Sequence, residues 1–329
     1  MYLGCGHALR LNSSDNGNSN FLEGTKMLKR NHYLEKLGPL DVIVVVLVCL
    51  FILAVVPVAC HQSQADSYRL QCAQNLSVIG KAMMNYANDY NGKLPRSGGS
   101  SSYYAPGIEK WNGADRFEAF DLEPDGSGGR ASISSCFYLL VKYDDVTPES
   151  FICPGDSGTT EFKIADANAG NRTLVDLWDF GPFGFAHCSY SYHMPFSFSI
   201  YTLTTAFEPG MAVAADRNPW IKSPAGKPKQ FPGNFTPDGD REAVKAGNAI
   251  SHQEEGQNVL FLDNHVNFAK RSFCGINNDN IYTYWHDGDI RMGQAPHPVA
   301  DPSDRKDSLL IHDLPIGRSP RPTRGPRKL

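Results

Sequence analysis

The sequence lacks the short motifs that identify many metal-dependent and nucleophilic enzymes. It contains no His-Glu-x-x-His pair for catalytic zinc and no Gly-x-Ser-x-Gly nucleophile elbow. None of its 8 cysteines forms a Cys-x-x-Cys pair, which argues against a thioredoxin-type redox site and a zinc ribbon. We therefore expect a protein that is not an enzyme.

An excess of positive charge is also missing. The chain has 31 Lys and Arg against 35 Asp and Glu, a net charge of −4, so nothing points to a nucleic-acid partner. No internal repeat is visible, and enough residues remain outside the terminal segments for one domain with a sizeable core.

One long apolar run is present. Residues 42–59 carry no charge and reach the length of about 17 residues that a membrane-spanning helix needs. We assign residues 37–60 to a transmembrane helix. A cleaved signal sequence and a lipid anchor on Cys60 are the alternatives.

The flanking cations predict the orientation. Lys26, Lys29, Arg30 and Lys36 precede the span, and few cations follow it closely. The positive-inside rule places the N-terminus in the cytoplasm and the rest outside, in a single-pass protein of the inner membrane. Membrane lipid is thus an expected partner.

Both ends of the chain lack hydrophobic periodicity. Residues 1–36 are expected to be a disordered, basic cytoplasmic leader, whose true start is either Met1 or Met27. Residues 295–329 are rich in proline and arginine and are expected to be a disordered tail.

Residues 61–95 predict an amphipathic stem helix that continues the span. Its apolar positions recur every three or four residues, a helical stripe that we expect to pack on a sheet. The stripe consists of Tyr68, Cys72, Leu76, Ile79, Met83, Tyr86 and Tyr90. Asn91-Gly92 is the expected end of the helix.

Residues 96–294 predict an extracytoplasmic α+β domain with long loop insertions. A short buried helix is expected over 133–143. Strands are expected over 151–155, 187–198 and 211–216. The clearest signal is a β-hairpin in which residues 259–262 enter, Asp263-Asn264 turn, and Val266 and Phe268 return. The predicted fold is a long N-terminal helix packed on an antiparallel sheet.

Five cysteines lie beyond the membrane segment, where an oxidising compartment allows disulfides. Together with Cys60 they allow about 15 full pairings, and spacing selects none of them. These candidates are Cys72, Cys136, Cys153, Cys188 and Cys274.

Oxygen-rich residues follow the hairpin. Asp279, Asp287 and Asp289 lie in a polar stretch that is a candidate calcium site, because calcium takes six to eight oxygen ligands. The alternative is a solvated polar turn with no bound ion. No other cofactor is expected.

His252, His265, Asp263 and Asp216 could be drawn into a catalytic or metal cluster, but no motif supports this. We favour a structural role for His252, a hydrogen bond that fixes the loop before the hairpin.

Aromatic residues in the loops could stack on sugar rings. Pinning of long loops is the commoner role and the one we favour for them. They are Tyr103, Tyr104, Trp111, Trp178, Trp220 and Trp285.

Three blocks of sequence resemble the pseudopilin-like, prepilin-type proteins with an H-X9-DG motif (DUF1559-type domain) of planctomycete-type bacteria. The blocks are Asp41 with RLQCAQNL at 69–76, FICP at 151–154, and residues 251–268, which contain His252, Asp263 and Asn264. The resemblance covers residues 37–95 and 250–285.

The resemblance implies a type IV pilin-like fold and a structural subunit of a type IV filament or type II secretion-like envelope system. Its expected partners are copies of itself, through the stem helix, and components of the secretion or pilus machine. In such an assembly, Asp41 would neutralise the amino terminus of an adjacent subunit.

The leader and the hairpin depart from the family pattern. Lys36 or Gly38-Pro39 stands at the cleavage position, ten residues separate His252 from Asp263, and Asn264 replaces glycine. The leader favours the alternative function, a non-assembling membrane-anchored protein that displays a ligand-binding domain, for example for polysaccharide.

Overall fold

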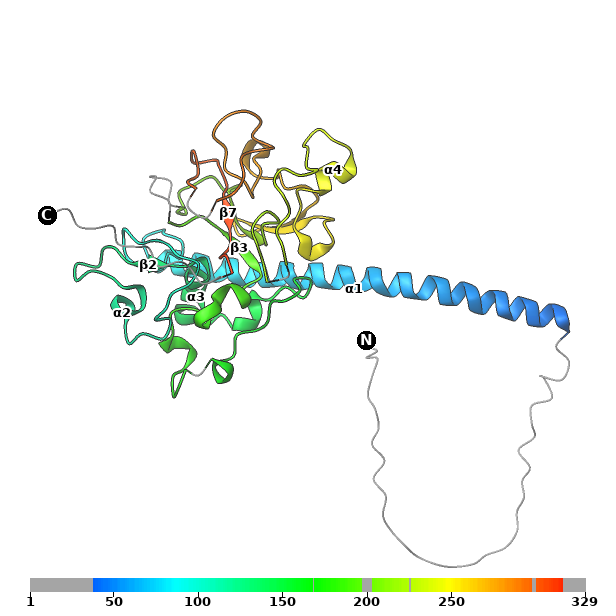
Figure 1. Ribbon diagram of the computed structural model, residues 1–329, viewed down its shortest axis with the longest axis horizontal. Coiled ribbons are helices and arrows are strands. Elements are labelled where there is room, and N and C mark those ends of the chain that lie inside the picture. The colour runs from blue at the N-terminus through cyan, green and yellow to red at the C-terminus, as the bar shows by residue number, and fades with distance from the viewer. Residues whose placement is uncertain (1–37, 168, 197–202, 225, 298–299, 316–329) are drawn as a thin grey trace, which may run out of the picture. The chain divides into compact units, whose positions relative to one another are not determined.

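The computed structural model describes residues 38–315 except 168, 197–202, 225 and 298–299, and side chains 57–61 are not described. The chain divides into two compact units, Met1–Val58 and Ala59–Leu329. Helix α1, Pro39–Asp89, has residues in both units (Figure 1). The expected leader, the Cys60 side chain and residues 316–329 of the expected tail lie outside the described residues.

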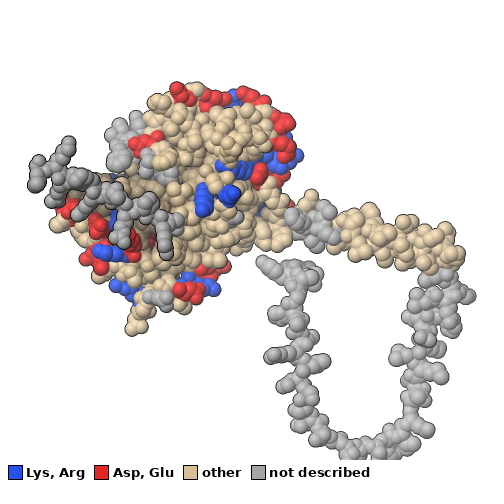
Figure 2. Space-filling view, viewed as in Figure 1, with Lys and Arg blue, Asp and Glu red and all other residues tan. Residues whose placement is uncertain are grey.

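In the first unit, the segment Pro39–Val56 of α1 is long and apolar enough to cross a membrane. Its mean hydropathy is 3.1 over 18 residues, and none of that window is buried. Figure 2 shows this part of α1 covered almost entirely by uncharged side chains. The Asp41 carboxylate accepts a hydrogen bond of 3.0 Å from the Gly38 backbone N–H. A carboxylate in the first turn also suits the positive end of the helix dipole.

The second unit is built on a five-stranded antiparallel sheet in the order β6-β5-β4-β3-β7. The strands are β3 Tyr190–His193, β4 Ala212–Asp216, β5 Gln257–Phe261, β6 Val266–Ala269 and β7 Leu310–Ile311. The predicted α+β class, with an antiparallel sheet, is confirmed.

Helix α1 uses the predicted stripe to pack on this sheet. Cys72, Leu76, Ile79 and Met83 are fully buried and share one apolar core with Leu260 of β5. The helix is followed by a left-handed Asn91 and Gly92, whose N–H bonds the Ala87 carbonyl at 2.7 Å. The prediction of the stem helix and its end is confirmed, but Tyr68 and Tyr90, at the two ends of the predicted stripe, lie outside this core, and Tyr90 is 41% exposed.

The opposite face of the sheet is also covered. Side chains of β5 point alternately to the two faces, and both sets are buried. Leu260 joins the α1 side, whereas Val259 and Phe261 join a second core with Trp220 and Tyr282. A strand buried on both faces needs an apolar run rather than strict alternation. This explains why residues 259–262 are all apolar.

The remaining elements are short. Helix α3, Ile133–Tyr143, has the predicted bounds and begins with a capping box between Ser132 and Ser135. The others are β1 Tyr103–Tyr104, β2 Arg130–Ala131, α2 Arg116–Phe120 and α4 Arg241–Lys245, and the 3₁₀ helices η2 Pro148–Phe151, η3 Ile164–Asp166, η4 Leu174–Asp176, η5 Gly181–Ala186, η6 Ile250–His252 and η7 Ile276–Asn278.

The hairpin prediction is confirmed, and Asn264 has the positive φ of 69° that its turn requires. The strand expected over 151–155 is wrong. Residues 148–151 form η2, which starts at Pro148, and Pro154 provides no N–H for a sheet ladder. The strand expected over 187–198 is shorter, and its residues 197–198 lie outside the described residues.

The expectation of a disordered tail from residue 295 is also wrong for much of its length. Leu310 and Ile311 form β7, which pairs with β3, and both side chains are fully buried. The apolar run 309–311 between polar residues was the signal for this strand. Its proline-rich surroundings obscured that signal.

Candidate functional site

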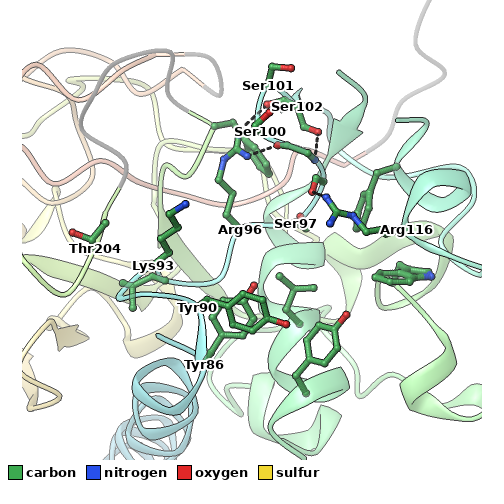
Figure 3. Close-up of a pocket in the computed structure, with 18 residues that line it drawn as sticks. Tyr86, Tyr90, Lys93, Arg96, Ser97, Ser100, Ser101, Ser102, Arg116 and Thr204 are labelled. Carbon is green, nitrogen blue, oxygen red and sulfur yellow. Dashed lines mark hydrogen bonds between the residues drawn. The ribbon is translucent and has the colours of Figure 1, made fainter. Parts of the chain in front are cut away.

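A pocket of about 710 Å³ opens beside the end of α1 (Figure 3). The last turn of α1, the chain that follows it and the end of α3 supply most of its walls. The lining residues are Tyr86, Tyr90, Lys93, Leu94, Arg96–Ser102, Arg116, Phe120, Leu139, Tyr143, Trp178, Phe196 and Thr204.

Three tyrosines form an aromatic wall of this pocket. The rings of Tyr86 and Tyr90 stack with centroids 4.0 Å apart and an interplanar angle of 10°. Tyr143 of α3 leans against both, at 6.5 Å and 6.3 Å. Burial raises the pKa of Tyr86 and of Tyr143, so these phenols stay neutral at physiological pH. The wall can stack a ring without adding negative charge.

Cations occupy the other side. Lys93, Arg96 and Arg116 line the pocket, and its described lining contains no carboxylate. Arg96 already donates to the Pro195 carbonyl at 2.9 Å and the Ser102 carbonyl at 3.3 Å, so it holds the serine-rich loop (Figure 3). Arg116 donates to the Gly98 carbonyl at 3.2 Å. Lys93 is exposed and, unlike Arg96 and Arg116, donates no side-chain hydrogen bond among the described contacts.

Three of the six loop aromatics, Trp111, Trp178 and Trp220, are buried in the domain, whereas Tyr103 is exposed. Trp111 packs edge-on against Phe162, and Trp220 packs against Phe231 and Tyr282. Of the six aromatics that the sequence suggested, Trp178 alone lines the 710 Å³ pocket in the described residues. The tyrosines at the end of the stem stripe provide the aromatic surface instead.

A second cluster lies buried where α1 meets the sheet. Cys72 of α1 and Cys153, which follows η2, form a disulfide with a sequence separation of 81. Asp216 ends β4 and His252 ends η6. One potential ligand atom from each of these four residues lies within 4.8 Å of the others.

The cluster has defined contacts. His252 Nε2 lies 3.1 Å from Asp216 Oδ2 and 3.7 Å from Cys153 Sγ. The Asn258 backbone N–H donates to Asp216 Oδ2 at 2.7 Å. All four side chains are at most 4% exposed, so the cluster is closed to solvent. The predicted structural role of His252 agrees with this burial.

The neighbouring residues hold the segments of this cluster together. Asn75 on α1 donates to the Ile152 carbonyl at 2.8 Å, next to Cys153. Arg217, which follows Asp216, forms a buried ion pair of 2.8 Å with Asp156. The expected strand 211–216 ended at Asp216, and no sequence pattern indicated the pair between Arg217 and Asp156, because Asp156 comes from a distant irregular segment.

The other candidate disulfide cysteines are free thiols. Cys136 contacts Ser97, Cys188 contacts the Tyr190 carbonyl and Cys274 contacts the Ser272 carbonyl. Each is held in a different part of the domain, so the prediction of disulfides at these three positions is wrong.

Asp263 and His265, in the turn of the hairpin, lie apart from this cluster in their described contacts. Asp263 pairs with His265, and both side chains are exposed. The aspartate that contacts His252 is Asp216 rather than Asp263. The spacing between His252 and Asp263 in the sequence did not indicate this partner.

The candidate calcium residues do not converge in the described part of the chain, where the cysteine, histidine and aspartate cluster is the one group of metal-ligand type found. Asp279 is fully buried and accepts from the Ser308 N–H at 2.8 Å. Asp289 pairs with Arg291 at 2.8 Å, and Asp287 accepts from Gln294 at 3.3 Å. A calcium ion at these residues stays a prediction.

Comparisons with protein-family models, with curated proteins and with solved structures find no match to this chain.

Proposed function

We propose that the protein is a membrane-anchored, pseudopilin-like structural subunit of a type IV filament or type II secretion-like envelope system. One observation carries the proposal: a single 51-residue helix supplies both an exposed apolar segment and the core face of an α+β unit. An apolar segment of this length is stable in a bilayer, where it can pack on a second copy of itself.

The proposed topology places the N-terminus in the cytoplasm and residues beyond the span outside the inner membrane. The cations that precede the span support this orientation. The Cys72–Cys153 disulfide agrees with an oxidising compartment. In an assembled filament, Asp41 would meet the amino terminus of a neighbouring copy.

Cysteine scanning of the span in native membranes tests the assembly. Cys49 is an exposed free thiol within α1, and Cys49→Ser provides the background. Single cysteines at positions 42–56 should cross-link into dimers with a recurrence of three or four residues, since one helix face meets the same face of its partner. Uniform or absent cross-linking would overturn homotypic packing.

The mass of the mature N-terminal peptide tests processing separately. A start at Leu37 or Pro39 supports a cleaved, assembly-competent subunit. A start at Met1 or Met27 supports a permanent anchor and favours the second candidate function.

The pocket favours that second candidate, an anchored protein that displays a saccharide-binding domain. Stacked tyrosines bind the faces of sugar rings, and Lys93 with two arginines suits acidic groups on them. We infer that acidic oligosaccharides would bind better than neutral ones of the same length.

Calorimetry with the full-length protein in detergent tests this binding. Tyr90→Ala should weaken binding about 2- to 10-fold, since an aromatic contact contributes about 0.5–1.5 kcal/mol. Tyr103→Ala is the matched control, because Tyr103 is similarly exposed but does not line the pocket. Lys93→Gln should reduce the preference for acidic ligands. An unchanged affinity in Tyr90→Ala would remove this candidate.

A further inference from the structure

The buried cluster of Cys72, Cys153, Asp216 and His252 contains more ligand chemistry than a disulfide requires. Two sulfurs, an imidazole nitrogen and a carboxylate come from α1, the loop after η2, β4 and η6. Asp216 is fully buried, and its Oδ1 has no hydrogen-bond partner among the described residues. A buried carboxylate oxygen without a partner is costly, and a cation would satisfy it.

The spacing of the cluster fits tetrahedral zinc. Zinc bonds of about 2.3 Å to sulfur and about 2.0–2.2 Å to nitrogen and oxygen place tetrahedral ligand atoms about 3.4–3.8 Å apart. His252 Nε2 lies 3.7 Å from Cys153 Sγ and 3.1 Å from Asp216 Oδ2. These two distances are near ligand spacing already, all four ligand atoms lie within 4.8 Å of one another, and the bonded sulfurs would have to separate.

We propose that the reduced chain binds one Zn²⁺ through Cys72 Sγ, Cys153 Sγ, His252 Nε2 and the Asp216 carboxylate, and that the disulfide is the oxidised alternative of the same site. A sulfur in a disulfide is not a thiolate and cannot serve as a thiolate ligand. The two states therefore exclude each other.

A dithiol reductant can convert the disulfide state into the zinc-binding state. The dithiol gives two electrons and two protons to the Cys72–Cys153 bond, which becomes two thiols, while the dithiol becomes a cyclic disulfide. Zinc then displaces one proton from each thiol to solvent. In the reverse step the cyclic disulfide is the oxidant: it takes two electrons from the two thiolates and two protons from solvent to become the dithiol again, while the Cys72–Cys153 bond re-forms and Zn²⁺ is released.

Residues around the four ligands would orient them. The Asn258 backbone N–H donates to Asp216 Oδ2 at 2.7 Å, and its side-chain amide donates to the Arg69 carbonyl at 3.2 Å. Partners of this kind fix the position of metal ligands. The disulfide links α1 to the loop after η2. The zinc ion would link the same two segments and also β4 and η6, through Asp216 and His252.

Zinc binding to the full-length protein in detergent tests the proposal. Protein reduced with a phosphine is compared with oxidised protein by competition against a colorimetric zinc chelator. We expect one zinc per chain in the reduced protein and none at this site in the oxidised protein. With cobalt(II) in place of zinc, thiolate charge-transfer and tetrahedral d–d absorption should appear in the reduced protein alone.

Variants locate the metal. Cys153→Ser should weaken the cobalt charge-transfer signal, and Cys72→Ser/Cys153→Ser should abolish it. Asp216→Asn should weaken zinc binding about tenfold or more, since loss of an outer partner alone costs about 10- to 100-fold. His265→Gln is the matched control for His252→Gln, because His265 also pairs with an aspartate but belongs to an exposed hairpin turn. Cys274→Ser controls for a free thiol.

Equal zinc binding by the reduced and oxidised parent proteins would overturn the proposal, and this comparison needs no variant. Retention of the cobalt charge-transfer signal in Cys72→Ser/Cys153→Ser, with a native circular dichroism spectrum, would also overturn it. Equal loss of binding in His265→Gln and His252→Gln would do the same, because the metal would then not be held by this cluster.

Discussion

Gly80 of α1 lies directly against the hairpin residue Asn264. A Cβ atom at Gly80 would come within 2.2 Å of Asn264 Oδ1 and 2.7 Å of Leu260 Cδ1. The absence of a side chain at position 80 therefore sets how closely the helix approaches β5 and its turn. Glycine is used here for close approach, since the helical backbone itself would accept any residue.

We expect Gly80→Ala to destabilise the domain by about 1–3 kcal/mol, the usual cost of overpacking. The Leu260 side chain is 1% exposed and has little room to move. Urea unfolding measures the change. Lys81→Ala, at an exposed position of the same helix turn, is the control and should change little. Equal stability of Gly80→Ala and the parent would contradict this packing.

Loss of the Cys72–Cys153 disulfide should lower the stability of the oxidised protein. The bond closes a long loop, with a sequence separation of 81, and removal of such a bond costs about 2–5 kcal/mol. The double variant Cys72→Ala/Cys153→Ala is compared with the parent by thermal unfolding under non-reducing conditions. Cys274→Ala should leave the midpoint nearly unchanged because Cys274 is a free thiol. A larger effect at Cys274 would point to a different pairing.

Truncation after Lys306 should prevent folding of the second unit. It removes β7 and the fully buried Leu309, Leu310 and Ile311, whose burial contributes on the order of 5 kcal/mol or more. It also removes Asp313, which accepts from the Ile133 and Ser134 N–H groups at 2.8 Å and 2.7 Å. Truncation after Pro315 removes no described residue and is the control. Native protease resistance of the shorter chain would refute the role of β7.

The contribution of the Asp179 and Asp313 carboxyls to stability should fall as the pH rises from about 4 to about 8, whereas buried His193, whose pKa burial lowers to about 4, contributes in the opposite sense. Burial, together with the nearby Asp313, raises the pKa of Asp179 to about 7, and burial raises the pKa of Asp313 to about 6. Unfolded aspartate has a pKa of about 3.9. Between these values the folded state binds more protons than the unfolded state, so raising the pH disfavours folding.

The two carboxyls lie at the start of α3, where Ser132 Oγ donates to Asp179 Oδ2 at 2.5 Å. Asp179→Asn should remove the Asp179 part of this loss, so the urea midpoint of the variant should gain on that of the parent as the pH rises across this range. Asp125→Asn is the control, since Asp125 is exposed and its pKa is lowered by hydrogen bonds from Ser127. A pH profile that is unchanged in Asp179→Asn would contradict the assignment.

Sequence patterns were enough to predict the elements whose conformation depends on residues close together in the chain. The stripe from Cys72 to Tyr86, helix 133–143 and the hairpin turn at Asn264 are all confirmed. In each of these, neighbours along the chain determine both the conformation and the buried face. The strand at Leu310–Ile311 was missed because two residues carry no periodicity, and its pairing with β3 comes from distant contacts.

The candidate sites depended on such distant contacts throughout. The sequence by itself identified Cys72, Cys153, Asp216 and His252 as residues with chemistry, and it identified an apolar segment long enough to cross a membrane. Only the tertiary structure decided that these four side chains meet, that Cys136, Cys188 and Cys274 stay unpaired, and that the tyrosines at the end of α1 face a cationic loop. Pairing across tens of residues depends on how helix and sheet close around one core, and no local pattern encodes that closure.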